Sequence, residues 1–203
     1  MGDKDLNTEN KVLEAAQEIF ILKGKSGARM QEIANKAGIN KALLHYYYRS
    51  KDKLFEAVFQ TVIKKLLIPK IIKLIESEQD VFSIIRTFVD FYVSLLIKNR
   101  YIPRFVIEEI NNNPSRLSDT FVKNEIPLQA ILQRFEEAME QGLIRKIDPR
   151  QIIVNMIAMC IFPFIATPML QPVLFDNKKR DFDAFLKQRK TEVADFIINS
   201  IKL

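Results

Sequence analysis

The sequence has few of the residues that build disulfide bonds and metal sites. It contains one cysteine, Cys160, and one histidine, His45, among 203 residues. An internal disulfide and a histidine cluster for a metal ion are therefore both excluded. A lone cysteine is typical of a reducing compartment, and no basic and apolar leader opens the chain, so we expect a cytoplasmic protein. We also expect no metal and no cofactor.

Tryptophan is absent and glycine is scarce, with 5 residues. This composition fits helices better than a glycine-rich β-architecture. The longest apolar run, Met156 to Ala166, is too short for a membrane-spanning helix and contains Pro163. With 48% hydrophobic and 28% charged residues, the chain is compatible with a soluble globular protein.

The sequence also lacks the usual signatures of an enzyme. It has no glycine-rich phosphate loop, no nucleophile with an evident base and no metal cluster. The neighbouring acids Glu108-Glu109 and Glu136-Glu137 point different ways on a helix, so they do not form paired carboxylates. We therefore expect a protein without catalytic activity.

The positive charge lies in one part of the chain. The formal net charge is +6, and the stretch from Lys23 to Lys53 carries eight basic side chains against two acidic ones. This stretch can account for the whole excess. Such a local excess indicates an anionic partner for this segment.

The same stretch predicts two short helices joined by a sharp turn. Met30, Ile33, Ala34 and Ala37 recur at helical spacing, and Gly38 follows as a helix-ending residue. Asn40 is a good N-cap for a second helix, from about Lys41 to Tyr47. The pattern is that of a helix-turn-helix motif, whose second helix enters the major groove of DNA.

A more specific signal lies between Ile33 and Leu54, in the segments Ile33-Ala34, Ala37-Gly38-Ile39, Tyr46-Tyr47-Tyr48, Ser50-Lys51-Asp52 and Leu54. Through these segments the stretch closely resembles the recognition region of the TetR family of bacterial transcriptional repressors. Leu43 stands where that family often has threonine, and His45 where it often has tyrosine.

Motif geometry and the resemblance together identify the residues expected to contact DNA. The first turn of the second helix faces base edges, tyrosine hydroxyls reach phosphates, and a lysine beside a helix amino end can hold a phosphate. The predicted DNA contacts are Arg29, Asn40, Lys41, Ala42, His45, Tyr46, Tyr47 and Lys51. The competing interpretation is a solvated basic face with one tyrosine in the core; for His45 it is surface packing. We assign Tyr48 to the core.

The remainder of the chain predicts helices without a useful strand pattern. Ser50 caps a connector helix that continues to Pro69, with a kink there, and Asp80 and Asp148-Pro149 begin later helices. We expect residues 1–7 to be loose and the first helix to close at Lys23-Gly24. The predicted fold is all-α, with a helix-turn-helix domain in residues 1–50 and a larger helical domain in residues 51–203.

The resemblance implies two further functions for the larger domain. The first is an apolar small-molecule pocket, which we assign to Phe88, Tyr92, Phe105, Phe121 and Met159, although such residues are more often plain core. The second is a homodimer built by the last two long helices, which we assign to Phe162, Phe164, Met169, Leu170, Phe196 and Ile197; the alternative is packing within one chain.

The sequence therefore predicts a dimeric repressor that binds a palindromic operator in double-stranded DNA and is released by a small apolar or amphipathic ligand. The alternative is a helical ligand-binding or interaction protein that has no specific affinity for DNA. A membrane partner is not expected. Neither the ligand, the operator nor the choice between repression and activation follows from these residues.

Overall fold

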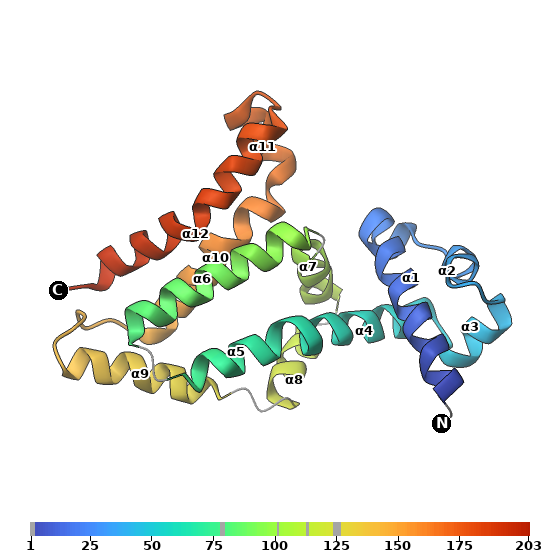
Figure 1. Cartoon of the computed structure of the whole chain (residues 1–203), viewed down its shortest axis with the longest axis horizontal. Coiled ribbons are helices and arrows are strands. Elements are labelled where there is room, and N and C mark those ends of the chain that lie inside the picture. Colours follow the sequence, from blue (N-terminus) through green and yellow to red (C-terminus); the bar gives the residue numbers. More distant parts are fainter. Residues whose placement is uncertain (1–2, 78–79, 101, 113, 124–126) are drawn as a thin grey trace. The chain divides into compact units, whose positions relative to one another are not determined.

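The computed structural model describes residues 3–77, 80–100, 102–112, 114–123 and 127–203, which are almost entirely helical (Figure 1). Within these ranges the only β-pairing is an isolated antiparallel bridge between Ile144 and Lys202. The predicted all-α class is confirmed. The helices form two compact units, Met1–Pro69 and Lys70–Leu203.

The first unit is built around α1, Asp3–Gly27, which packs against α2, Met30–Ala37, and α4, Lys51–Val62. The short helix α3, Lys41–Tyr47, packs on α2. The rings of Phe20 and Phe55 are fully buried between α1 and α4, edge to face at 5.1 Å. Aromatic pairs in this arrangement stabilise a core by about 1 kcal/mol beyond their buried area.

The first helix is longer than the sequence predicted. It begins at Asp3, within the segment expected to be loose, and ends at Gly27. The predicted break at Gly24 is present as a non-helical residue with φ 67° and ψ 173°, after which the chain resumes a helical turn. Glycine adopts this positive φ at no steric cost, which explains the interruption.

The connector begins where the sequence predicted, because Ser50 accepts a hydrogen bond from the Lys53 amide at 3.1 Å. A π-helical turn, Ile63–Leu67, interrupts the connector after α4. Helix α5, Ile68–Ile75, then continues through Pro69. A proline ring crowds the carbonyl group four residues earlier, and a widened turn before it relieves this contact. The connector packs on α1, so the first compact unit extends beyond the expected division at residue 50.

The second unit surrounds α6, Val81–Lys98, which packs on α9, Leu128–Glu140, on α10, Pro149–Ile165, and on α12, Lys179–Ile201. As expected for a helix that is apolar on several faces, α6 buries seven residues. The remaining helices are α7, Ile102–Asn112, α8, Pro114–Lys123, and α11, Thr167–Phe175.

Helix ends in the second unit follow local chemistry. Asp80 accepts hydrogen bonds from the amides of Phe82 and Ser83 at 2.9 and 3.1 Å, and Asp148 accepts one from Arg150 at 2.9 Å. Both caps were predicted.

No single helix of the described ranges is long and apolar enough to cross a membrane. Only α10 and α11 taken together have that length and apolar character, and this pair is bent by 76°.

Candidate nucleic-acid interface

The turn between α2 and α3 is formed by two residues with defined roles. Gly38 has φ 71°, in the left-handed region, and the Ile39 amide donates to the Ala34 carbonyl at 3.0 Å. Asn40 then starts α3, because its side-chain oxygen accepts from the Leu43 amide at 2.7 Å. The predicted limits of both helices and the role of both residues are confirmed.

Helix α3 is amphipathic, with one side chain in the core and most of the others on the surface. Leu44 of α3 and Ile33 of α2 are both fully buried, and the two helices pack against each other. The exposed side chains are Lys41, Ala42, Leu43, His45 and Tyr46, and the exposed fraction of Tyr46 is 80%. A helix with one buried side chain and five exposed ones presents a continuous surface to a partner.

The predicted tyrosine contacts differ in exposure. The rings of Tyr46 and Tyr47 lie edge to face at 5.6 Å, so the exposed ring is supported by the half-buried one. His45 lies on the same exposed surface, with Nδ1 3.4 Å from the Arg49 carbonyl oxygen. This long contact leaves most of the imidazole facing solvent.

Tyr48 belongs to the core, as the sequence predicted. Its side chain is 8% exposed, and its hydroxyl donates to Glu9 of α1 at 2.9 Å. Burial, followed by the hydrogen bond to the Glu9 carboxylate, raises the pKa of the Tyr48 phenol well above its usual range. The hydroxyl therefore stays protonated and ties α1 to the end of α3.

Lys51 has internal partners. Its Nζ donates to the backbone carbonyl oxygens of Ser26 and Ala28, both at 3.2 Å, and its side chain is half-buried. Nearby, the Lys25 ammonium group pairs with Asp52 at 3.1 Å. The ammonium group of Lys51 already makes these two hydrogen bonds, and its predicted phosphate contact stays a prediction.

Some basic side chains of the stretch from Lys23 to Lys53 form ion pairs with acidic residues, and others do not. Lys23 pairs with Glu32, whose pKa is lowered by this hydrogen bond, and Lys36 pairs with Glu18 at 2.7 Å. Among the ion pairs between described residues, none involves Arg29, Lys41 or Arg49. All three are exposed.

Arg49 is therefore a candidate that sequence reasoning missed. It follows Tyr48 directly and precedes the cap of α4. Arg49 was counted among the basic side chains of the stretch from Lys23 to Lys53, but the helix-turn-helix pattern assigned it no role. Arg29, which precedes α2 as its N-cap residue, was predicted and remains a candidate.

In the second unit, the residues predicted to line a pocket lie in different environments. Tyr92 and Phe105 are buried, and the ring of the half-buried Phe88 lies 5.4 Å from that of Tyr92. Met159 lines a separate hollow of 190 Å³ between α10 and α12, with Phe196 and Ile197. The side chain of Phe121 lies outside the described residues.

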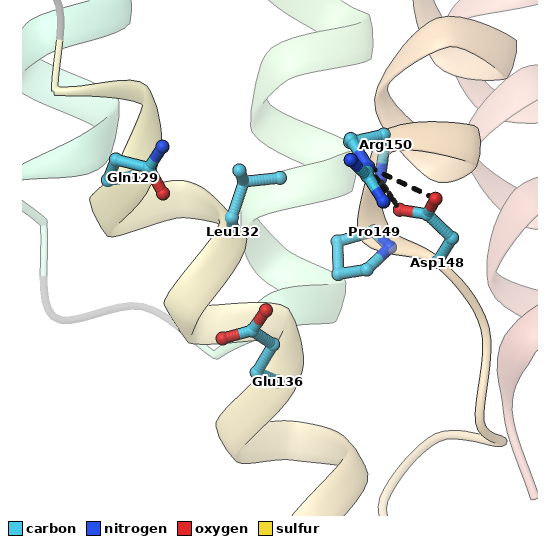
Figure 2. A pocket seen from close by; sticks show the side chains of 6 residues that line it. All are labelled: Gln129, Leu132, Glu136, Asp148, Pro149 and Arg150. Carbon is cyan, nitrogen blue, oxygen red and sulfur yellow. Dashed lines mark hydrogen bonds and ion pairs between the residues drawn. The ribbon is translucent and has the colours of Figure 1, made fainter.

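Two larger hollows lie at the surface of the described part of the second unit. One, of 510 Å³, is lined by residues of the first turns of α12, from Lys179 to Lys187. The other, of 470 Å³, lies between α9 and the start of α10 (Figure 2). There the Arg150 Nε donates to both carboxylate oxygens of Asp148, at 2.9 and 3.1 Å, and lowers the pKa of Asp148. The lining residues are Gln129, Leu132, Glu136, Asp148, Pro149 and Arg150.

Cys160 lies in the core of the second unit, with 1% of its surface exposed. Burial raises the pKa of its thiol to about 12. The thiol therefore stays protonated at neutral pH, and reactions that require a thiolate are disfavoured.

The residues predicted to form a dimer interface divide into two groups. Phe162, Met169 and Phe196 are 54%, 54% and 62% exposed, and Leu170 is half-buried. Phe164 and Ile197, in contrast, are buried within the chain, because they lie on the helix faces that pack inward. The exposed group is extended by further large apolar side chains, Val154, Ile157, Ile165, Val173 and Leu174.

Comparison with known proteins covers both units. Residues 12–58 match the model of the bacterial regulatory proteins of the tetR family, and residues 83–197 match that of the tetracyclin repressor-like C-terminal domain. The transcriptional repressor NicS of Pseudomonas putida is 34% identical over 55 residues, which is 27% of this chain and 26% of NicS. The chain thus spans about a quarter of the length of that relative.

Solved structures match the whole length. The fatty acid degradation regulator FadR of Bacillus halodurans has a TM-score of 0.70 at 16% identity, covering 98% of this chain and 96% of FadR. AibR, in complex with isovaleryl coenzyme A and operator DNA, has a TM-score of 0.67 at 18% identity, covering 95% of this chain and 97% of AibR. With both family models matched and the fold shared, this chain belongs to the TetR family of bacterial regulatory proteins.

Proposed function

We propose that this protein is a DNA-binding transcriptional regulator that reads its site with α3. The observation that carries the proposal is the surface of that helix, where Lys41, Ala42, His45 and Tyr46 are exposed while Leu44 alone is buried. Lys41 occupies the first turn, the part of a recognition helix that meets base edges. Arg29 and Arg49 supply charge for the phosphates.

A homodimer on a palindromic operator follows from the same proposal. One α3 is only 7 residues long and reads a few base pairs, so specific binding needs a second copy about one DNA turn away. The exposed apolar side chains of α10, α11 and α12, among them Phe162, Met169 and Phe196, are the surface we assign to the contact between copies. A two-fold axis would place each of them against the same surface of the partner.

We further propose repression relieved by a small apolar or amphipathic ligand bound in the second unit. The support is twofold: few charges interrupt the central helices, where Tyr92 and Phe105 are buried, and the structure of AibR is a complex with both isovaleryl coenzyme A and operator DNA. By linkage, a ligand that lowers operator affinity must itself bind less tightly to the DNA-bound protein. The site of action is the bacterial cytoplasm, where the operator is found.

Selection of preferred sequences from a random DNA pool, followed by fluorescence anisotropy at several salt concentrations, tests the DNA-binding proposal. We expect one preferred palindrome and a steep salt dependence. Lys41→Ala should weaken binding and change the preferred base at one position of each half-site. Lys187→Ala, which removes the same charge from α12, is the control and should leave both properties unchanged. Weak binding without sequence preference would favour the helical interaction protein instead.

The ligand proposal is tested separately with the selected palindrome. Adding short- and medium-chain acyl coenzyme A thioesters and fatty acids one at a time should identify a compound that raises the operator dissociation constant. Calorimetry on the free and the DNA-bound protein should then give the reciprocal change in ligand affinity. Ligand binding that leaves operator affinity unchanged contradicts this part of the proposal and leaves DNA recognition intact.

A further inference from the structure

The loop of residues 25–28, which leads into α2, consists of the last turn of α1, after the break at Gly24, and of Ala28. The last carbonyl groups of a helix have no partner within it, and the break at Gly24 adds a second irregularity. Within this loop the Ala28 amide donates back to the Gly24 carbonyl at 3.2 Å. The carbonyl groups of Ser26 and Ala28 take no part in this bond and can accept from other donors.

Both carbonyl groups accept hydrogen bonds from Lys51, which lies 25 residues after Ser26 and 23 residues after Ala28. Its single ammonium group reaches the Ser26 and Ala28 carbonyl oxygens at 3.2 Å each. A cation at this position also suits the negative end of the α1 dipole. The first residue of α4 therefore holds the loop that leads into α2.

A second lysine joins the same two segments in the opposite direction. Lys25 of the loop pairs with Asp52 of α4 at 3.1 Å, and its ammonium group lies 5.2 Å from the centre of the buried Phe55 ring. The Lys25 side chain is 17% exposed and that of Asp52 is 73% exposed, so the ammonium end of this ion pair is largely buried while the carboxylate faces solvent. Two crossed contacts thus connect residues 25–28 to residues 51–52.

We propose that Lys51 is a positioning residue that clamps the loop of residues 25–28 to the start of α4, and that it contributes to DNA binding through this clamp. The residue after the clamped loop is Arg29, which is exposed and starts α2. Fixing the Ala28 peptide group fixes the direction in which the Arg29 side chain leaves the loop. The clamp makes the connector, the loop and the reading helices move as one body.

This assignment rests on the proposed function for its effect on DNA, and it differs measurably from a phosphate contact. The slope of log affinity against log salt is negative, and removing a lysine that neutralises one phosphate reduces its magnitude by about 0.9. Removing a positioning lysine weakens binding and leaves that slope unchanged, because the number of released counterions stays the same. If Lys51 acts through the clamp, Lys25→Met should reproduce the effect of Lys51→Met. If Lys51 contacts a phosphate instead, Lys25→Met should not reproduce it.

The test uses full-length protein with Lys51→Met, Lys25→Met and the control Lys53→Met. Lys53 lies on the same turn of α4, with its side chain 70% exposed and paired to Glu56 at 3.3 Å. Hydrogen exchange at the Ala28 amide should be faster in the first two variants and unchanged in the control. Operator affinity of the first two should fall about tenfold, the loss expected for one hydrogen bond to a charged donor, with the wild-type salt slope.

The outcomes separate the two proposals. Unchanged exchange at Ala28 in Lys51→Met, or a salt slope reduced in magnitude by about 0.9, overturns the clamp. If the wild-type protein prefers no DNA sequence, the proposed function fails, and the exchange measurement still decides whether the clamp exists. Circular dichroism confirms that each variant is folded.

Discussion

The sharpest test of the helix-turn-helix assignment compares two glycines that have the same backbone conformation in different units. Gly38, between α2 and α3, has φ 71°, and Gly142, after α9, has φ 69°. At both positions a Cβ added to the glycine would meet no atom within 4 Å, so alanine adds no steric clash. The cost of substitution is therefore backbone strain alone.

The expected magnitude follows from two opposing contributions. An L-residue in the left-handed region costs about 1–2 kcal/mol, and replacing glycine by alanine recovers about 0.4–1 kcal/mol by restricting the unfolded chain. We expect Gly38→Ala and Gly142→Ala each to lower the free energy of unfolding by about 1 kcal/mol. Gly38→Asn should cost less, because asparagine tolerates this region.

The two variants should differ in DNA binding. Relief of strain at Gly38 turns α3 relative to α2, whereas relief at Gly142 leaves the first unit untouched. Urea unfolding followed by circular dichroism measures stability, and fluorescence anisotropy measures operator affinity. A Gly38→Ala variant as stable as the wild type would refute the assigned strain. Equal losses of operator affinity in Gly38→Ala and Gly142→Ala would refute the role of this turn in orienting α3.

Three further predictions concern single residues. His45→Tyr should keep or strengthen operator binding in a gel shift, since it restores the residue that the family often has; a large loss would contradict the alignment. The pKa of Asp183 is lowered by Lys179 and Arg100, so its contribution to stability is present above about pH 4 and is lost as the pH falls. Asp183→Asn should accordingly flatten the acid side of the thermal melting profile, and an unchanged profile would contradict the pairing. Phe162→Glu, on the exposed side of α10, should produce monomers in sedimentation velocity; dimers that persist at micromolar concentration would exclude this surface.

The parts of the fold that sequence reasoning predicted correctly depend on contacts close along the chain. Gly38, Asn40 and Ser50 act on residues within four positions, so their types alone identify the limits of α2, α3 and α4. Local chemistry therefore sufficed for the limits of these three helices.

The parts that were missed depend on distant contacts or on helices with weak patterns. The hydrogen bonds of Lys51 to Ser26 and Ala28 were not predicted, because they join segments more than 20 residues apart, which no local pattern reveals. Helix α11 contains two prolines and buries no residue, so neither propensity nor periodicity predicted it. Composition likewise could not separate the exposed Phe162 from the buried Phe164.

The most direct test of the central claim is the ratio of two dissociation constants, measured at one physiological salt concentration. One belongs to the selected palindrome and the other to a scrambled duplex of the same composition. We predict that the palindrome binds at least about 1,000-fold more tightly and that two chains occupy it. Equal affinity for the two duplexes would contradict the assignment of α3 as a sequence-reading helix.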